Sequence, residues 1–346
     1  MRILIASDAW EPQMNGVVRV LGITAERLRG FGHEVEVVGP DRFARTLPAP
    51  GYPEVRLALA PARALAGIIE RFRPDAIHIP VEGPIGWAAR HYCRRRGLPF
   101  TTSFHTRFGD YFDKRLGFGS GLATRVQRWF HNGGAGFMVQ TDTLERELGA
   151  RGFRRIRRWG RAVDTDLFRP WREEPGFDAG FLALPRPIFL YLGRVSPEKS
   201  IEDFLSLDLP GSKVVVGDGP ALDALRRRFP AAHFLGRRTG EEVARHFSAA
   251  DVFVFPSRFE TFGLVVLEAL ACGTPVAALP VPGPLDILGE APVAVLSEDL
   301  RDAALRALAI DRAACRRFAE GFSWERCTRE FEANLVPIPP AAWDLA

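Results

Sequence analysis

Short apolar runs alternate with longer segments of helical spacing in both halves of this chain. In the first half, apolar runs predict buried strands at 2–6, 34–38, 76–79, 100–104 and 137–139, with helices at 17–28, 64–72 and 86–96. The pattern restarts at 188–192 and continues through 213–216, 232–235, 252–255, 275–278 and 291–295. Short apolar strands separated by helices indicate parallel sheets covered on both faces. Two such blocks predict an α/β protein of two doubly wound domains with a cleft between them.

A stretch rich in proline, glycine and acidic residues, 168–187, is the expected linker between the two blocks. We therefore place an N-terminal domain at 1–168 and a C-terminal domain at 169–324. Helical spacing then continues into the tail through Trp324, Cys327, Phe331 and Leu335, until three prolines stop it.

The composition is that of a globular protein, with 346 residues of which 47% are hydrophobic and 25% charged. No apolar run approaches the roughly 20 residues that a membrane helix needs, and no signal peptide is expected at the start. The four cysteines are scattered without metal spacing, which indicates reduced thiols of a cytoplasmic protein.

The net charge of +4 hides an asymmetry between the two halves. Residues 1–170 hold 27 Lys and Arg against 17 Asp and Glu, whereas residues 171–346 hold 19 against 25. A basic half favours an anionic partner, either a phospholipid surface or a nucleic acid. The alternative is an arginine-rich composition with solvated faces, since the chain has only three lysines.

The segment FETFGLVVLEALACGTP, at 259–275, carries the most specific chemical signal. Glu260 lies beside a turn-like Thr-Phe-Gly, and Glu268 lies about two helical turns further on if a helix begins near Gly263. A helix N-terminus attracts phosphate, and carboxylates accept hydrogen bonds from sugar hydroxyls. The pair therefore indicates a site for a nucleotide-diphosphate sugar.

Candidate phosphate ligands follow the ends of other predicted strands. Gly193 and Arg194 come directly after the strand at 188–192, and Lys199 lies at the next helix start, so both cations can neutralise a diphosphate without a metal. Gly217 and Asp218 follow the strand at 213–216 and can approach a base or ribose, although a β-turn explains them equally well. Gly16 opens the first helix and can offer its backbone N–H to phosphate.

The end of the strand at 100–104 supplies candidates for sugar recognition. His105 should face the cleft, where its imidazole can hydrogen-bond a sugar hydroxyl or a developing charge, and a structural histidine is the alternative. In the following loop Asp110 is expected to orient an acceptor hydroxyl, with Arg107 beside it.

A basic amphipathic helix is expected after this loop, before 132. It suits a membrane interface or a lipid, although an ordinary core-facing helix is as good an interpretation. Its apolar stripe and flanking cations are Leu122, Val126, Trp129 and Phe130 with Arg125 and Arg128, and a second basic patch follows at 154–159.

Together these motifs resemble the retaining glycosyltransferases of family 4, which have the GT-B fold of two Rossmann-like domains facing a central cleft. The resemblance covers nearly the whole chain and is most specific in the glutamate pair with its intervening TFGLVVL. It is supported by GRVSPEK, VVVGDGP, SFHT and WGRAVDTDLFRP. SDAWEPQMNGVVRVL and SFHTRFGDYF look like the members, α-mannosyltransferases among them, that use UDP-hexose or GDP-mannose to glycosylate lipids.

The resemblance implies a role for each matching residue. Arg194 and Lys199 would hold the diphosphate, which Gly16 would approach from the other domain, and Glu268 would bind the ribose hydroxyls. Glu260 and His105 would contact the donor sugar, and the tail, 325–346, would cross back onto the first domain. Backbone contacts to phosphate or sugar would come from Phe262, Gly263 and Leu264.

The expected reaction is therefore transfer of a hexose from a nucleotide-diphosphate sugar to an acceptor hydroxyl, with retained configuration. UDP-glucose is the first expectation for the donor and GDP-mannose the second, and no metal or other cofactor is expected. The acceptor is expected to be a membrane lipid such as diacylglycerol or a glycolipid, reached by a cytoplasmic protein peripheral on the inner membrane face.

Alternatives remain at this point. The acceptor can instead be a soluble saccharide, or the same fold can host a sugar-nucleotide epimerase or a phosphorylase. A nucleic-acid binder is disfavoured, because basic and aromatic residues do not interleave on a strand face.

Overall fold

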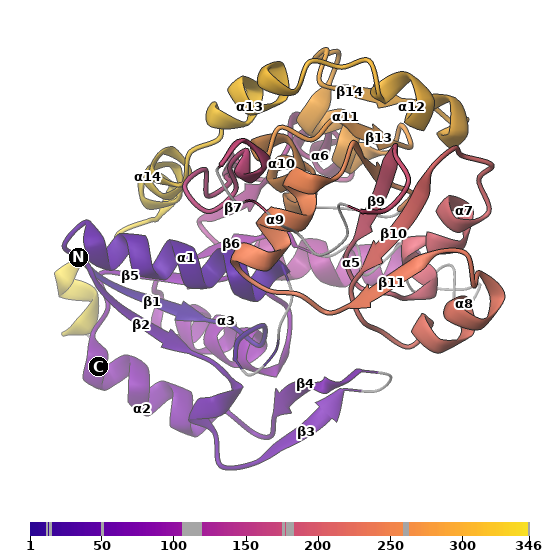
Figure 1. Ribbon diagram of the computed structural model, residues 1–346. Helices are drawn as coiled ribbons and strands as arrows, with labels where there is room; N and C mark the ends of the chain where they lie inside the picture. The colour runs from indigo at the N-terminus through magenta and orange to yellow at the C-terminus, as the bar shows by residue number, and fades with distance from the viewer. Residues whose placement is uncertain are drawn as a thin grey trace. The chain divides into compact units, whose positions relative to one another are not determined.

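The chain forms two compact units in the computed structural model, which describes residues 1–11, 13, 16–49, 52–105, 120–174, 177, 183–258 and 263–344 (Figure 1). Unit 1 comprises Met1–Gly160 and Glu325–Ala346, and unit 2 comprises Arg161–Trp324. In the part of the chain that is described, no helix has the length and apolarity needed to cross a bilayer.

Unit 1 is built on a six-stranded parallel sheet in the order β2-β1-β5-β6-β7-β8. Its strands are β1 (Arg2–Ala6), β2 (Glu34–Val38), β5 (Ala76–Ile79), β6 (Thr101–Ser103), β7 (Gly136–Val139) and β8 (Ile156–Arg158). Its helices are α1 (Gly16–Gly30), α2 (Ala62–Phe72), α3 (Pro84–Arg96), α5 (Ser120–His131), α6 (Asp142–Ala150) and α14 (Trp324–Asn334). A separate hairpin is formed by β3 (Thr46–Ala49) and β4 (Tyr52–Ala58).

Alternation along the strands explains why helices cover both faces of this sheet. Leu4 and Ile77 belong to one buried cluster with the apolar side of α2 and α3. The neighbouring His78 points to the opposite face, where its ring contacts Phe331 of α14. Figure 1 shows α1 and α2 on opposite sides of β1 and β2.

Unit 2 repeats this plan with the strand order β11-β10-β9-β12-β13-β14. Its strands are β9 (Ile188–Leu192), β10 (Ser212–Val216), β11 (His233–Gly236), β12 (Val252–Phe255), β13 (Val276–Ala278) and β14 (Ala294–Leu296). Its helices are α7 (Ile201–Leu205), α8 (Leu222–Arg228), α9 (Glu241–Ala249), α10 (Leu264–Ala271), α11 (Pro282–Leu288), α12 (Leu300–Ala307) and α13 (Arg312–Glu320).

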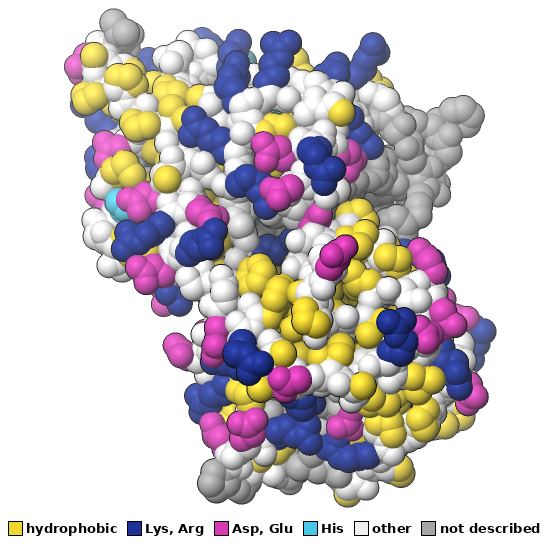
Figure 2. Space-filling view, turned by 90° about the horizontal axis from the view of Figure 1, so that it is seen from above, with side chains coloured by type: hydrophobic (Ala, Val, Ile, Leu, Met, Phe, Trp, Pro, Cys, Tyr) yellow, Lys and Arg dark blue, Asp and Glu magenta, His cyan; other side chains and the backbone are white. Residues whose placement is uncertain are grey.

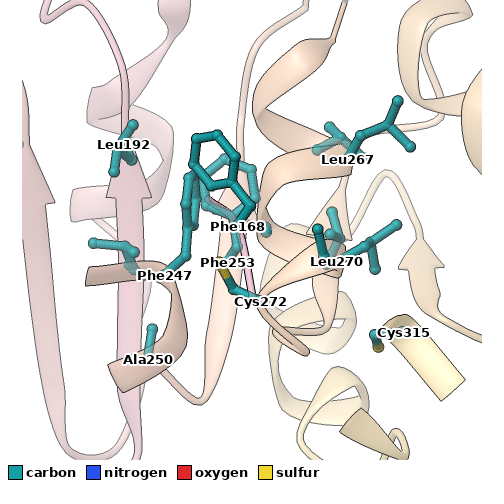
Figure 3. Packing of buried hydrophobic residues seen from close by; sticks show 14 of the residues in the cluster. Phe168, Leu192, Phe247, Ala250, Phe253, Leu267, Leu270, Cys272 and Cys315 are labelled. Carbon is teal, nitrogen blue, oxygen red and sulfur yellow. The ribbon is translucent and has the colours of Figure 1, made fainter. Parts of the chain in front are cut away.

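Each strand of unit 2 contributes to two separate cores. Leu190 packs with α9, α10 and α13, and Phe189 packs on the other face with α7, α8 and α12. Figure 3 shows Phe247 and Phe253 between the strand that carries Leu192 and the helix that carries Leu267. A sheet buried on both faces explains why these strands are continuous apolar runs.

The linker predicted at 168–187 begins too late, because the structure divides the chain after Gly160. The backbone N–H of Val163 donates to Phe322 O at 2.9 Å, and Phe168 is 1% exposed within the unit 2 core. Residues 161–168 are therefore part of unit 2, held there by apolar burial that the loop-like composition of the segment does not reveal.

Two further elements correct the sequence interpretation. The basic patch at 154–159 contains the edge strand β8, in which Arg157 Nη1 donates to Asn334 O of α14 at 2.9 Å. The last strand of unit 2 was predicted at 291–295 and instead spans Ala294–Leu296, because Val293 still lies in a turn that bonds to Ala291 O.

Candidate functional site

The strand order of unit 2 reverses at β9, which lies between β10 and β12. The chain leaves β9 toward one edge through β10 and β11 and then returns to pair β12 with β9 on the other side. Open α/β sheets bind ligands at such a switch point, outside the carboxyl ends of the strands. Gly193 and Arg194 follow β9 at this edge, and the N-terminus of α10 follows β12.

The loops after β9 and β10 are fastened to each other by backbone hydrogen bonds. Gly193 N donates to Val216 O at 3.0 Å, and Val195 N donates to Asp218 O at 2.9 Å. A Cβ at Gly217, where φ is +149°, would lie 1.8 Å from Gly193 O. Glycine is therefore required at Gly217 for close packing of the two loops, independently of any ligand.

Tyr191, in the preceding strand β9, fixes the backbone of Arg194. Tyr191 is 1% exposed, and its hydroxyl donates to Arg194 O at 2.8 Å. The Arg194 side chain itself is exposed. Lys199 ends a short 3₁₀ turn, Pro197–Lys199, and its backbone N–H donates to Ser196 O at 3.0 Å. Both predicted cations thus lie on ordered turns at the carboxyl edge of the unit 2 sheet.

Helix α10 begins where the sequence predicts, directly after Gly263. Gly263 is the N-cap, with φ +59° and no side-chain cap, and the first turn of the helix contains no acidic residue. A helix start of this kind can attract an anion through its dipole and its backbone N–H groups. Leu264 is the first helical residue, and Glu268 lies on the same helix with only 3% exposure. Glu260 and Phe262 lie outside the described residues.

The carboxyl edge of the unit 1 sheet gathers a second set of polar side chains. Asp8 follows β1 and accepts hydrogen bonds at 3.0 Å from the backbone N–H groups of Ile85 and Gly86 in the first turn of α3. Burial raises the pKa of Asp8 to about 6 in spite of these two bonds. Asp8 thus fixes the start of α3 beside the switch point between β1 and β5.

His105 ends a chain of buried hydrogen bonds that crosses from β5 to β6. His78 Nδ1 lies 2.9 Å from Thr101 Oγ1, and His78 Nε2 lies 3.0 Å from Ser103 Oγ. Ser103 Oγ lies 2.8 Å from His105 Nε2. All four side chains are at most 5% exposed.

These hydrogen bonds determine which nitrogen of His105 carries the proton. Thr101 Oγ1 donates to Ile77 O, so it accepts from His78 Nδ1–H. Burial lowers the pKa of His78 well below its usual value, so His78 is neutral and its Nε2 accepts the proton of Ser103. Ser103 can then only accept from His105 Nε2–H. Burial lowers the pKa of His105 to about 4, so the imidazole is neutral with Nδ1 as its acceptor nitrogen.

A second buried network flanks the first. His131 Nε2 lies 2.9 Å from Glu82 Oε1, and Gln127 Nε2 donates to the same oxygen at 3.0 Å. Burial opposes ionisation of Glu82, but the hydrogen bond and charge of His131 and the hydrogen bond of Gln127 outweigh it and lower the Glu82 pKa. His78, Glu82 and His131 could not be recognised from the sequence, because only the pairing of β6 with β5 and with β7 places them near His105.

We expect Ser103→Ala to lower kcat/KM for glycosyl transfer about tenfold, equal to a lost hydrogen bond of about 1.4 kcal/mol. The variant removes the acceptor of His105 Nε2–H, so the Nδ1–H tautomer becomes accessible. Long-range ¹H–¹⁵N spectra of the histidines at pH 6 should show Nε2–H alone in the wild type and a mixture in the variant.

Thr24→Val is the matched control. Thr24 is also a fully buried hydroxyl of unit 1, but it belongs to α1 and takes no part in the hydrogen bonds that link His78 to His105. Ser103→Thr should restore the Nε2–H tautomer. Equal kcat/KM and equal tautomer populations in Ser103→Ala and Thr24→Val would contradict the assignment.

The remaining predicted residues divide between described and undescribed parts of the chain. Gly16 is the first residue of α1 and is exposed, and a Cβ placed on it would meet no atom within 4 Å. Arg107 and Asp110, the expected acceptor residues, lie outside the described residues. Among those that are described, no three His, Cys, Asp or Glu side chains lie together as metal ligands. All four cysteines are buried thiols.

Solved structures share the fold of this protein. It aligns over 96% of its length with sucrose-phosphate synthase from Thermosynechococcus elongatus, at a TM-score of 0.72, 20% identity and 97% coverage of that chain. It also aligns over 96% of its length with Anabaena HepE in complex with UDP-glucose, at a TM-score of 0.73, 15% identity and 98% coverage of that chain. These structures show that the fold is GT-B.

Sequence comparison then identifies the family. Residues 14–167 match Glycosyltransferase Family 4, and residues 186–310 match Glycosyl transferases group 1. The GDP-mannose-dependent alpha-mannosyltransferase of Mycolicibacterium smegmatis is 30% identical over 83% of this chain and 82% of that protein. Sulfoquinovosyl transferase SQD2 of Arabidopsis thaliana is 32% identical over 76% of this chain and 56% of that protein. The chain belongs to glycosyltransferase family 4.

Proposed function

We propose that this glycosyltransferase moves a mannosyl group from GDP-mannose to a hydroxyl of a membrane lipid, such as diacylglycerol or a glycolipid, with retention of configuration. The observation that carries the proposal is the unit 2 switch point, where Arg194, Lys199 and the N-terminus of α10 follow adjacent strand ends. GDP-mannose is preferred to UDP-glucose because three relatives at 28–31% identity are named for it.

Unit 2 would bind the nucleotide. The Arg194 fork and the Lys199 charge would neutralise the diphosphate, and the first turn of α10 would offer backbone N–H groups to the same phosphates. Glu268 would accept from the ribose hydroxyls, and Gly217 with Asp218 would border the nucleoside. Because Arg194 and Lys199 would neutralise the charge of the leaving diphosphate, we propose that transfer requires no metal. Chelation of metal ions by EDTA should therefore leave the transfer rate unchanged.

The proposed reaction proceeds on one face of the sugar. The bond from the anomeric carbon to the β-phosphate oxygen breaks as the acceptor oxygen bonds to the same face of that carbon. The acceptor proton passes to the departing phosphate oxygen, so no carboxylate nucleophile is needed. His105 would contact the donor sugar and orient it, and Glu260 would contact the same sugar.

The acceptor and location follow from the basic character of the first half of the chain. Its excess of arginine favours an anionic surface, so we place the enzyme on the inner face of the cytoplasmic membrane, with Arg107 and Asp110 at the acceptor hydroxyl. A soluble saccharide acceptor is the rival outcome of the test below.

Thermal unfolding with GDP, UDP and ADP, each without metal, tests the donor. A ligand that binds only the folded state stabilises it by about 2.7 kcal/mol at one hundred times its Kd. GDP should raise the midpoint more than UDP does. Labelled GDP-mannose should then give labelled lipid in the presence of diacylglycerol vesicles. A shift with UDP alone would replace the donor, and label transferred only to soluble saccharides would replace the acceptor.

A further inference from the structure

Unit 1 contains a cavity of about 560 Å³ that is lined mainly by arginines. It lies where α3 and α5 end and β6 to β8 begin, which is the amino edge of the sheet. His105 lies at the carboxyl edge, directly after β6. The cavity is therefore separate from the polar groups described above. Its lining includes five arginines and one tryptophan: Arg90, Arg94, Arg125, Arg128, Arg154 and Trp129.

Among the described residues of unit 1, no acidic side chain forms an ion pair with the arginines of this cavity. Neighbouring ion pairs use other arginines, such as Arg151 with Glu147 and Arg158 with Asp142. Over much of the face drawn in Figure 2, basic and acidic side chains lie next to one another. An excess of one sign of charge in a concave site concentrates counter-ions.

The cavity is preorganised by hydrogen bonds to the backbone. Arg90 donates from Nε to Phe130 O at 3.1 Å and from Nη2 to Trp129 O at 2.9 Å. Its guanidinium carbon lies 3.7 Å from the centre of the Trp129 ring. Arg128 Nη1 donates to Arg151 O at 3.0 Å. Burial lowers the pKa of Arg90, and repulsion by the nearby charge of Arg94 lowers it further. A bound anion would relieve this repulsion.

An exposed apolar stripe on α5 leads to the same cavity. Leu122, Val126 and Trp129 are 70%, 44% and 61% exposed, and their spacing places them on one side of the helix. The sequence interpretation placed Phe130 in this stripe, but Phe130 is fully buried in the unit 1 core. Exposed Trp and Leu beside arginines are typical of a helix that lies in the headgroup region of a bilayer.

We propose that this surface docks unit 1 on a membrane that contains anionic phospholipid. The arginine cavity takes the phosphate of a lipid headgroup, and Leu122, Val126 and Trp129 enter the boundary between headgroups and acyl chains. The residues of this docking surface take no part in the proposed transfer reaction. Membrane docking agrees with the lipid acceptor proposed above but does not depend on it.

Co-sedimentation tests this surface with phosphatidylcholine vesicles, with and without phosphatidylglycerol. The full chain should bind the anionic vesicles more tightly than the neutral ones. The double variant Arg94→Gln/Arg125→Gln should bind anionic vesicles about thirtyfold more weakly, which corresponds to about 2 kcal/mol for two arginines near the surface. Leu122→Gln should weaken the binding that persists in high salt.

Arg63→Gln/Arg71→Gln is the matched control, because both arginines are exposed on α2 of the same unit and removing them changes the net charge equally. The control should bind vesicles like the wild type, and all variants should keep the GDP-induced thermal shift. Equal vesicle binding by the two double variants would overturn the docking surface. Stabilisation by free inorganic phosphate without vesicle binding would also overturn it and assign the cavity to a soluble anion.

A failure of the proposed transfer can be distinguished from a failure of this proposal. Vesicle binding that depends on Arg94 and Arg125 supports the docking surface even if GDP gives no thermal shift. If GDP raises the thermal midpoint and lipid is mannosylated, but the Arg94→Gln/Arg125→Gln variant binds vesicles like the wild type, the proposed reaction is supported and the docking surface is overturned.

Discussion

Arg194→Ala is expected to lower kcat/KM for glycosyl transfer by about 10²–10³-fold, the usual cost of removing one preorganised donor to a developing charge. Arg194 follows β9 at the switch point of unit 2, and Tyr191 fixes its backbone. Its side chain is exposed, so truncation should leave folding intact. Initial rates with a labelled nucleotide sugar, together with the thermal midpoint, measure both quantities.

Arg194→Lys separates charge from geometry. Lysine keeps the charge but lacks the planar fork that pairs with two phosphate oxygens, so an intermediate kcat/KM is expected. Arg226→Ala is the control, because Arg226 is an exposed arginine of α8 in the same unit whose described hydrogen bond is a 3.5 Å contact with Phe234 O. If Arg194→Ala retained the kcat/KM of the control, Arg194 would have no part in the reaction.

Gly217→Ala is expected to lower the free energy of unfolding of unit 2 by about 3–5 kcal/mol, from backbone strain and overpacking combined. The added methyl group would lie 1.8 Å from Gly193 O, at a φ of +149° that L-residues rarely adopt. Relief of this clash would move the loop that carries Arg194. The variant should therefore also lose the stabilisation by GDP, as measured by urea unfolding with and without the nucleotide.

Gly236→Ala isolates the cost of backbone conformation. Gly236 has φ +73°, but a Cβ there meets no atom within 4 Å, so the expected loss is about 1–2 kcal/mol. Its GDP stabilisation should persist. Equal unfolding free energies for the two alanine variants would show that the close approach of Gly217 to Gly193 is not a stabilising constraint.

Apolar periodicity was sufficient to predict most of the sheet, because strands such as β9 and β12 are buried on both faces. It was insufficient for β8, in which Ile156 is followed by two arginines that stand at a half-buried sheet edge. The hairpin β3–β4 was also missed, since prolines interrupt both strands and neither joins the main sheet.

Local motifs indicated candidate site residues that lie just after a strand, as Arg194 and His105 do. They could not reveal the partners of His105, because His78 reaches Ser103 only through the pairing of β5 with β6. The arginine cavity draws on α3, α5 and the segment before β8, which are distant in sequence. Charge counting indicated a basic half of the chain but could not place the charges on one edge of the sheet.

The return of α14 to unit 1 reverses the usual order of maturation during synthesis. Phe331 is fully buried against His78 and Trp159, and Glu330 accepts from Gly160 N at 2.9 Å. Unit 2 is continuous in sequence and can complete its core as it leaves the ribosome. Unit 1 must keep the sheet face that carries His78 and Trp159 without its final helix until residues 161–324 have been made. The half of the enzyme that is translated first is the last to be finished, so nascent chains stalled within unit 2 should depend on chaperones that shield that face.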